Sequence, residues 1–437
     1  MTRVLVISHG HPAFSIGGAE VASYALFRAL NATTGIEAFF LSRAAPPMRR
    51  HAATPLMNLR QGEREVFFHT DSWDEFWLSN GGLADLEGAF ADYLEHVRPD
   101  VVHFHHVIGL GLEAIVQVRR QMPTTRVVIT FHEYLPICAN HGQMVKTGRG
   151  TLCHAASPAA CSGCFPQRTP AEMFGRERHI KDHLLLADAF VSPSRFLAER
   201  FIAWGMPAER FHVVENGLEG TPVPMRPLSP GGRRDRFGFF GQITEFKGLH
   251  ILLDAVGRVP DAVWGDATLN VFGGNLEFQP DSFRTHFAAL MERAGRRARF
   301  HGPYRPEDLP RLMAGVDWTV VPSIWWENSP VVIQEAFLHR RPPITNDIGG
   351  MAEKVTDGID GLHFRVGSPE DLADRLTQAL LEPGICDRLA AAAPRPPNLA
   401  DFARLHLGIY GGTPATPAQD RPKPPSRPRP QPSRRAA

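Results

Sequence analysis

The chain has 437 residues, enough for two domains with sizeable cores, and its 43% apolar and 21% charged residues are typical of a soluble globular protein. No apolar run approaches the length of a membrane span, and residues 1–410 carry 41 Lys and Arg against 45 Asp and Glu. This acidic body argues against nucleic acid as the main partner. The five cysteines are odd in number and no secretory leader opens the sequence, so we expect a reducing, cytoplasmic environment.

The first half of the chain alternates strand and helix patterns. Residues 4–8 are a short apolar run, followed by a loop with Gly17 and Gly18 and by helical periodicity over 19–30. Further strands are predicted at 37–41, 66–69, 100–105, 126–131, 187–192 and 212–214, and helices at 83–97, 110–121 and 195–204, the last capped by Ser194. This alternation predicts a mainly parallel, doubly wound sheet, although the glycine loop is not a dinucleotide fingerprint.

Histidines lie at the predicted ends of two of these strands. His103, His105 and His106 surround one strand end, and His132 follows another. The carboxyl ends of parallel strands are where α/β folds bind ligands, so these histidines are functional candidates rather than ordinary surface residues.

Four cysteines follow His132 within 27 residues: Cys138, Cys153, Cys161 and Cys164, spaced C-x14-C-x7-C-x2-C. Four thiolates can hold a structural zinc ion tetrahedrally, and the final C-x2-C fits a zinc knuckle. A second tight pair is missing, so reduced thiols in an irregular insertion are the alternative.

The second half repeats the strand–loop–helix pattern after a linker rich in Pro and Gly. Strands are predicted at 236–240, 267–272, 299–302, 318–321 and 342–346, with helices beginning near 351 and 369 and a late amphipathic helix at 398–410. The first loop of this half, 241–248, contains Lys247 beside a glycine, which suits a phosphate although it is not a Walker A loop.

The most informative stretch follows the strand at 318–321. Ser329 and Pro330 are the N-cap and first-turn residues that a helix start prefers. Glu327 is then expected in the loop before the helix and Glu335 about two turns inside it. Two carboxylates and a helix N-terminus would meet at the carboxyl edge of a parallel sheet, a setting that binds anions. Two solvated surface glutamates are the alternative interpretation.

These features together resemble the retaining GT-B glycosyltransferases of family 4, over roughly residues 3–410. The most specific mark is Glu327-x7-Glu335, supported by the Gly17-Gly18, Lys247-Gly248 and Gly349-Gly350 pairs with Glu353 downstream. The cysteine insertion resembles a subgroup found among bacterial surface-polysaccharide transferases.

The resemblance implies two Rossmann-like domains of doubly wound parallel sheet, facing each other across a central cleft. The expected divisions are an acceptor-side domain at 1–220 with a Cys-rich insertion at 133–170, a linker at 221–232, a nucleotide-sugar domain at 233–392, a helix crossing back at 393–410 and a disordered Pro/Arg-rich tail at 411–437. The basic tail could touch anionic lipid as a peripheral membrane contact, or remain solvated.

The resemblance also assigns roles to residues. Those implied for catalysis are His132, Glu327 and Lys247; those implied for binding the nucleotide and diphosphate are Gly17, Gly18, Gly241, Gln242, Lys247, Val331, Val332 and Glu335. Glu335 would hydrogen-bond the ribose, Glu327 would contact the donor sugar, and Lys247 would neutralise the leaving phosphate. Gln242 departs from the family, which commonly has an arginine there, and part of the leaving-group stabilisation is thereby in doubt.

The implied reaction moves a sugar from a UDP-, GDP- or ADP-sugar to a glycan or lipid-linked acceptor with retention of the anomeric configuration, without a catalytic metal; a zinc on the cysteines would be structural. Two alternatives remain at this point. One is a sugar-nucleotide epimerase or a phosphorylase on the same fold, and the other is a non-catalytic, zinc-stabilised scaffold.

Overall fold

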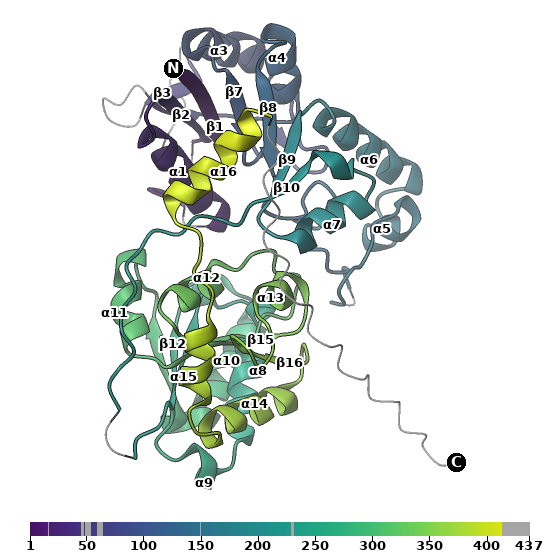
Figure 1. Ribbon diagram of the computed structural model, residues 1–437. Coiled ribbons are helices and arrows are strands. Elements are labelled where there is room, and N and C mark those ends of the chain that lie inside the picture. Colours follow the sequence, from purple (N-terminus) through teal and green to yellow (C-terminus); the bar gives the residue numbers. More distant parts are fainter. Residues whose placement is uncertain are drawn as a thin grey trace.

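The computed structural model describes residues 1–15, 17–44, 48, 54–58, 64–148, 150–228 and 231–412. They form two α/β units, each built on a largely parallel sheet, drawn one above the other in Figure 1.

The first unit holds the eight-stranded sheet and a small hairpin. Its strands are β1 (Thr2–Ser8), β2 (Ile36–Arg43), β3 (Leu56–Asn58), β4 (Glu65–Phe68), β7 (Val101–Phe104), β8 (Arg126–Thr130), β9 (Ala189–Ser192) and β10 (Phe211–Val213), with β5 (Trp73–Asp74) and β6 (Ser79–Asn80) in the hairpin. Its helices are α1 (Gly18–Asn31), α2 (Leu83–Asp85), α3 (Ala91–Val97), α4 (Glu113–Gln121), α5 (Pro158–Cys164), α6 (Pro170–Leu184) and α7 (Arg195–Ala203).

The second unit holds the six-stranded sheet. Its strands are β11 (Arg236–Phe240), β12 (Thr268–Phe272), β13 (Ala298–Gly302), β14 (Trp318–Val321), β15 (Pro343–Asn346) and β16 (Leu362–Phe364). The helices that follow β10 are α8 (Leu249–Arg258), α9 (Asp261–Trp264), α10 (Asp281–Ala294), α11 (Leu309–Ala314), α12 (Val331–Leu338), α13 (Gly349–Lys354), α14 (Pro369–Leu381), α15 (Ile385–Ala392) and α16 (Leu399–Tyr410).

Each sheet has a point where its strand order reverses. The first sheet runs β10-β9-β8-β7-β1-β2-β4-β3, and every pairing is parallel except that of β3 with β4. The second runs β13-β12-β11-β14-β15-β16, with parallel pairings throughout. The reversals fall between β7 and β1 and between β11 and β14, so each sheet has a ligand-binding crevice position at its carboxyl edge.

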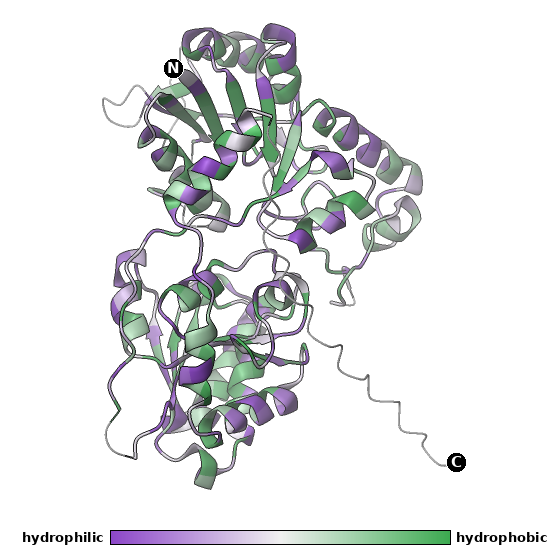
Figure 2. Cartoon of the chain, viewed as in Figure 1, coloured by the Kyte–Doolittle hydropathy of each residue, from purple (hydrophilic) through white to green (hydrophobic). Residues whose placement is uncertain are grey.

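Both sheets are buried between helices, which explains why their strands read as continuous apolar runs. Helix α8 shows the matching helical pattern, because Leu249, Leu252, Leu253 and Val256 are all buried against the second sheet. The colouring of Figure 2 follows this arrangement, with apolar strands inside and polar helix faces outside.

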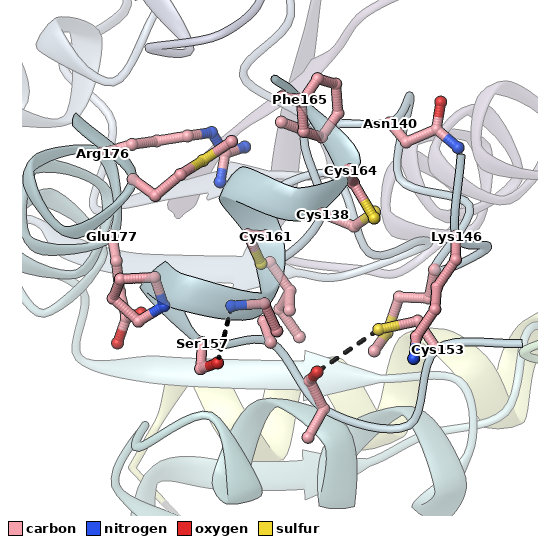
Figure 3. A pocket seen from close by; sticks show the side chains of 18 of the residues that line it. Cys138, Asn140, Lys146, Cys153, Ser157, Cys161, Cys164, Phe165, Arg176 and Glu177 are labelled. Carbon is pink, nitrogen blue, oxygen red and sulfur yellow. Dashed lines mark hydrogen bonds between the residues drawn. The ribbon is translucent and has the colours of Figure 1, made fainter. Parts of the chain in front are cut away.

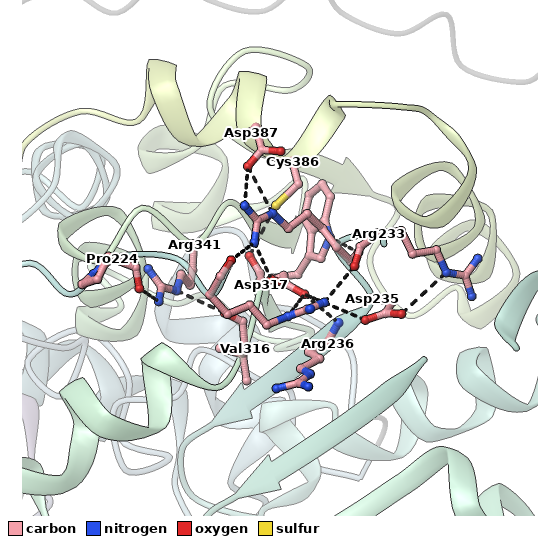
Figure 4. Close-up of polar contacts among 12 residues, drawn as sticks. Pro224, Arg233, Asp235, Arg236, Val316, Asp317, Arg341, Cys386 and Asp387 are labelled. Atoms are coloured by element: carbon pink, nitrogen blue, oxygen red, sulfur yellow. Dashed lines mark hydrogen bonds and ion pairs between the residues drawn. The ribbon is translucent and has the colours of Figure 1, made fainter. Parts of the chain in front are cut away.

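Buried charges fix the linker to the second unit. The fully buried guanidinium of Arg341 donates a hydrogen bond to the carbonyl of Pro224 at 2.8 Å (Figure 4). It donates another to the carbonyl of Val223 at 3.0 Å. Asp317, also fully buried, forms an ion pair with Arg226 at 2.7 Å. A buried charge is tolerated only when it is paired and hydrogen-bonded, so these contacts are structural and hold residues 223–226 in place.

The last helix, α16, lies on the first unit although the second unit precedes it in the chain (Figure 1). Phe402, Ile409 and Tyr410 belong to the core that contains Val4 of β1. The Tyr410 hydroxyl lies 2.7 Å from Nδ1 of His103. The chain therefore crosses between the two units twice.

Most predicted elements occur within a few residues of their expected positions. The Ser194 cap is confirmed, because its hydroxyl accepts a hydrogen bond from the amide of Leu197. The helix expected at 83–97 contains a π-helical turn, Leu86–Phe90. The elements that were not predicted are helices α5, α6, α9, α10, α11 and α15 and strands β3, β5, β6 and β16. The predicted disordered tail lies outside the described residues from 413 onward, and no described helix is long and apolar enough to cross a membrane.

Candidate active site

The candidate site lies where the strand order of the second sheet reverses. Loop 241–248 leaves the carboxyl end of β11, and loop 322–330 leaves that of the neighbouring β14. The two loops are packed together: the Ile324 amide donates to the Phe246 carbonyl at 2.9 Å. Gly248 has a φ of +69°, and a Cβ there would collide with the Pro322 carbonyl, so only glycine fits. This packing holds Lys247 beside the loop that carries Glu327.

Glu327 is ionised and held by three donors. It is 7% exposed, and its Oε1 accepts hydrogen bonds from Lys247 Nζ (2.6 Å), Ser323 Oγ (2.7 Å) and Trp325 Nε1 (3.1 Å). Burial alone would raise the pKa of this carboxyl, but the Lys247 ammonium and the two neutral donors outweigh burial and lower it. Ser323 and Trp325 were not singled out from the sequence; their position within four residues of Glu327, in the same loop, was the available signal.

The helix that carries Glu335 begins one residue later than predicted. Pro330 is the N-cap of α12, with extended backbone (φ −61°, ψ 116°), and Ser329 lies before the cap. The predicted Ser329 cap is therefore wrong: its hydroxyl is buried and hydrogen-bonds to none of the described residues. The first helical residues, Val331 and Val332, are half-buried, and their amides stand in the open first turn.

Glu335 differs from Glu327 in having no partner. Its carboxyl forms no hydrogen bond or ion pair with any residue that the structure describes, and burial raises its pKa to about 7. The residue keeps a partly exposed surface, so a ligand can reach it. In the loop before α12, Asn328 Oδ1 is buried and also lacks a described partner. Polar groups removed from solvent are normally hydrogen-bonded, so the side chains of Glu335 and Asn328 are candidates for binding a ligand.

Gly241 and Gln242, two further residues predicted to bind the donor, lie at the start of loop 241–248. Gly241 has a φ of +149°, and its carbonyl occupies the position that a Cβ on Gly273 would need. Gln242 is exposed, and its side chain forms no hydrogen bond with the described residues. The structure thus brings Gly241, Gln242, Lys247, Glu327 and the start of α12 to one sheet edge.

His132 reaches this site from the first unit. It follows β8, and its Nε2 lies 2.9 Å from Nδ1 of His105. Burial, together with the neighbouring His106 and His9, lowers the pKa of His132 to about 3, so the ring is neutral at pH 7. Its backbone carbonyl accepts a hydrogen bond from Asn328 Nδ2 at 2.7 Å. The residue beside Glu327 therefore contacts the backbone of His132 directly.

Gly17 and Gly18 lie at the start of α1, on the first sheet's carboxyl edge. A Cβ on Gly17 would collide with the carboxylate of Glu20, whereas Gly18 faces open space. Glu20 is buried and accepts hydrogen bonds from Ser15 Oγ (2.7 Å), with His9 Nε2 at 3.3 Å. Although burial opposes it, this pairing lowers the pKa of Glu20 to about 2. Sequence reasoning missed Glu20, and the Gly-Gly-Ala-Glu spacing was the signal.

The four cysteines of the insertion line one small cavity of about 50 Å³ between α5, α6 and the loop 138–157 (Figure 3). Burial raises the pKa of Cys138 and of Cys161, and the neighbouring thiols raise both further. Among the described residues, however, no group of three or more His, Cys, Asp or Glu side chains is arranged to hold a metal ion. The thiols share a cavity without forming a ligand set, and the structural zinc stays a prediction.

Comparison with known families covers most of the chain. The family described as "Glycosyltransferase Family 4" matches residues 16–219, and the family described as "Glycosyl transferases group 1" matches residues 234–382. The chain therefore belongs to the family 4 glycosyltransferases.

Among curated relatives, a D-inositol 3-phosphate glycosyltransferase of Xylanimonas cellulosilytica is 27% identical over 259 residues, which is 56% of this chain and 59% of that protein. A glycogen synthase of Mycobacterium tuberculosis is 27% identical over 41% of this chain and 42% of its own length. The chain thus spans about 59% of the length of the first of these relatives.

Solved structures cover the chain more fully. Anabaena Alr3699/HepE in complex with UDP-glucose superposes with a TM-score of 0.63 at 18% identity, over 94% of this chain and 100% of that one. The sucrose-phosphate synthase of Thermosynechococcus elongatus gives a TM-score of 0.67 at 18% identity, over 94% and 99%. These similarities confirm the predicted GT-B fold with its two Rossmann-like domains.

Proposed function

We propose that the protein transfers a sugar from a nucleotide-diphosphate-sugar to a hydroxyl group of a glycan or lipid-linked acceptor. The observation that carries this proposal is that one sheet edge holds two carboxyl groups, one with hydrogen-bond partners and one without. Glu327 is ionised and bound to Lys247 at 2.6 Å, while Glu335 is half-buried and has no described partner. The UDP-glucose complex of the similarly folded HepE supports a nucleotide-sugar as the donor.

Donor binding is assigned to the unit at 233–392 and acceptor binding to the unit at 1–220. The Glu335 carboxylate accepts hydrogen bonds from the ribose hydroxyls, which supply the donors it lacks. The amides of Val331 and Val332 and the N-terminal dipole of α12 receive the diphosphate. Gly241 and Gln242 border this position, and Gly17 and Gly18 close it from the first domain, where open space faces Gly18.

The chemical step breaks the bond between the anomeric carbon and the leaving phosphate oxygen. Lys247 stabilises the charge that develops on the phosphate, and ionised Glu327 stabilises the positive charge on the sugar. The acceptor oxygen attacks from the face that the phosphate leaves, its proton passes to the departing phosphate oxygen, and the configuration is retained. The three hydrogen bonds to Glu327 Oε1 favour this electrostatic role over covalent attack. His132 borders the donor sugar as a neutral ring.

A thermal-shift screen with UDP, GDP, ADP and their sugars identifies the donor. The matching nucleotide raises the unfolding temperature, because a ligand that binds only the folded state stabilises it by mass action. Incubation of the matching donor with glycan acceptors, followed by NMR of the product's anomeric proton, then tests transfer and retention. Wild-type protein that neither binds nor slowly hydrolyses any nucleotide-sugar would overturn the proposal.

The two alternatives give different results in the same assays. An epimerase converts the nucleotide-sugar without any acceptor, which NMR of the donor detects. A phosphorylase needs inorganic phosphate to cleave a glycan. A non-catalytic scaffold binds nucleotide without turnover, and the ionised Lys247–Glu327 pair argues against such a decayed site.

The zinc prediction is kept as a separate part of the proposal. It rests on four thiols that line one cavity, and it requires them to converge on the ion, because the described geometry contains no ligand set. Elemental analysis of purified protein should find about one equivalent of zinc, and less than about 0.2 equivalents would exclude the site.

A further inference from the structure

Trp326 belongs to the second domain by sequence but is buried in the first. It lies in loop 322–330, between β14 and α12, and is 5% exposed. The other described residues buried in the same hydrophobic cluster come from the first domain, among them Phe131, Tyr134 and Leu197. Loop 322–330 of the second domain thus inserts the large side chain of Trp326 into the core of the first domain.

The socket that receives Trp326 is built from the Cys-rich insertion and from α7. The indole Nε1 donates a hydrogen bond to the carbonyl of Cys153 at 2.9 Å. His154 meets the indole edge-on with ring centroids 5.1 Å apart, and Phe196 packs at 5.4 Å. The guanidinium of Arg200 lies 4.7 Å from the indole centroid, a cation–π geometry.

Hydrogen bonds also hold the parts of the socket together and hold the backbone of Trp326 in it. Arg200 donates a hydrogen bond to the carbonyl of His154, which joins α7 to the insertion. On the other side, the Tyr134 hydroxyl donates to the carbonyl of Trp326 at 3.4 Å. Both the ring and the backbone of Trp326 are therefore held by the first domain.

Glu327 lies between two residues that contact the first domain. Trp326 fills the socket on one side, and on the other Asn328 donates to the carbonyl of His132. The indole Nε1 of Trp325 donates a hydrogen bond to Glu327 Oε1 at 3.1 Å, and Lys247 Nζ donates to the same oxygen. The loop is thus pinned to the first domain immediately before and after the carboxylate that contacts the donor sugar.

We propose that Trp326 is a positioning residue that fixes Glu327 against His132 across the interdomain cleft, and that the Cys-rich insertion forms the socket for it. Two domains of one chain move relative to each other unless a substantial apolar contact joins them, and a buried tryptophan supplies that contact. The catalytic part of this inference rests on the proposed sugar transfer; the docking part does not.

The test compares Trp326→Ala, Trp326→Phe and the control Phe278→Ala, which removes a 79% exposed aromatic ring of the second domain. Small misplacement of a reacting group costs about 100-fold in rate, so Trp326→Ala should lower kcat by about that factor. Trp326→Phe keeps the ring but loses the hydrogen bond to the Cys153 carbonyl, and should lose about tenfold. Nucleotide Kd should stay within about threefold in both, because the contacts proposed for the ribose and for the diphosphate at the start of α12 lie in the second domain.

The same variants are measured by small-angle X-ray scattering without donor or acceptor. Trp326→Ala should increase the radius of gyration, and so should Arg200→Gln, which weakens the socket from the first-domain side; Phe278→Ala should change nothing. Unchanged scattering with kcat within about threefold of wild type would overturn the proposal, as would an equal loss of kcat and of nucleotide binding, which indicates general damage. If the wild type transfers no sugar, the proposed function fails while scattering still decides the docking.

Discussion

The two sheets present different chemistry at their carboxyl edges. On the first, the carboxyl groups of Glu20 and Glu133 each contact a histidine, His9 and His106 respectively, and burial raises the pKa of Glu133 to about 8. On the second, Glu327 is paired with Lys247, but Glu335 has no described partner. The two carboxyls of the first edge thus have side-chain partners, whereas the second edge leaves one carboxyl and a helix N-terminus open.

This difference indicates which edge is built for a polar ligand. A buried polar group without a partner costs free energy, and a protein keeps one where a ligand supplies the missing hydrogen bonds. The first edge has a shape that its own contacts maintain, and it approaches the second edge through the backbone of His132 and the socket of Trp326. The comparison predicts that changes to the carboxyls of the second edge alter catalysis and nucleotide binding, whereas a change to Glu20 on the first edge alters stability.

The largest expected effect is on Glu327. Glu327→Gln removes the negative charge but keeps a side chain of the same length, so kcat should fall about 10³-fold, the loss typical of one electrostatic group in an active site. Nucleotide Kd should change by less than kcat, because the contacts proposed for the ribose and the diphosphate come mainly from Glu335 and the start of α12. The matched control is Glu370→Gln, a 60% exposed carboxylate of the same domain. Steady-state kinetics and isothermal titration decide the question, and turnover within tenfold of wild type would contradict the role of Glu327.

Glu335→Gln should weaken nucleotide binding by about 30-fold, equal to about 2 kcal/mol for a hydrogen bond to a charged acceptor. In the proposed donor complex the ribose hydroxyls bind the ionised carboxyl of Glu335, whose pKa is raised to about 7. Wild-type affinity should therefore fall as the pH decreases below about 7, and the variant should lose this dependence. Titration between pH 5.5 and 8.5 measures it; a pH dependence that persists in Glu335→Gln would assign it to another group.

The same raised pKa has an opposite consequence for folding. Because the folded pKa lies above the usual 4.5, the protonated carboxyl is favoured in the folded state, and stability from Glu335 is lost as the pH rises from 4.5 through about 7. Glu335→Gln should thus gain stability relative to wild type over this range, which denaturant unfolding at pH 5 and pH 8 checks.

Glu20→Gln tests the first edge. Glu20 is buried and paired with His9, so the change should cost about 1.5 kcal/mol in free energy of unfolding at pH 7 while nucleotide Kd stays constant. The pKa of Glu20 is lowered to about 2, so its stabilisation is complete above about pH 4.5 and is lost as the pH falls toward 2. The exposed pair of Glu87 with Arg120 supplies the control, Glu87→Gln, with less than about 0.5 kcal/mol. A large loss of nucleotide affinity in Glu20→Gln would break the contrast between the edges.

The sequence was sufficient for the two sheets and for the residues at the second edge, because buried parallel strands read as apolar runs and their ends locate the site. It also contained a missed signal. Thr169 and Glu172 form a capping box at the start of α6, and the Thr-x-x-Glu spacing was visible. The Ser329 error arises at Pro330, whose ψ of 116° is extended rather than helical, so the helix starts one residue later and Pro330 is the cap.

Contacts between distant segments could not be predicted. Trp326 bonds to the carbonyl of Cys153, 173 residues away, and nothing in either segment marks the other. The pairing of Glu20 with His9 and the absence of a partner for Glu335 also depend on tertiary packing, which periodicity does not encode. For these reasons the sequence indicated that Glu327 and Glu335 lie at the same sheet edge, but not how their pKa values separate.

Gln242→Arg has the smallest expected effect. It tests whether a positive charge at the start of loop 241–248 strengthens nucleotide binding at the second edge. The side chain is exposed at the start of loop 241–248 and forms no hydrogen bond with described residues, so an arginine has room to extend. A guanidinium binds phosphate oxygens in a bidentate way that an amide cannot, but an exposed ion pair is worth only up to about 1 kcal/mol. Nucleotide affinity should therefore rise by about two- to fivefold, with a stronger dependence on salt than in the wild type. Titration at low and high ionic strength measures both, and unchanged affinity would place Gln242 outside the diphosphate position while leaving the roles of Lys247 and Glu335 intact.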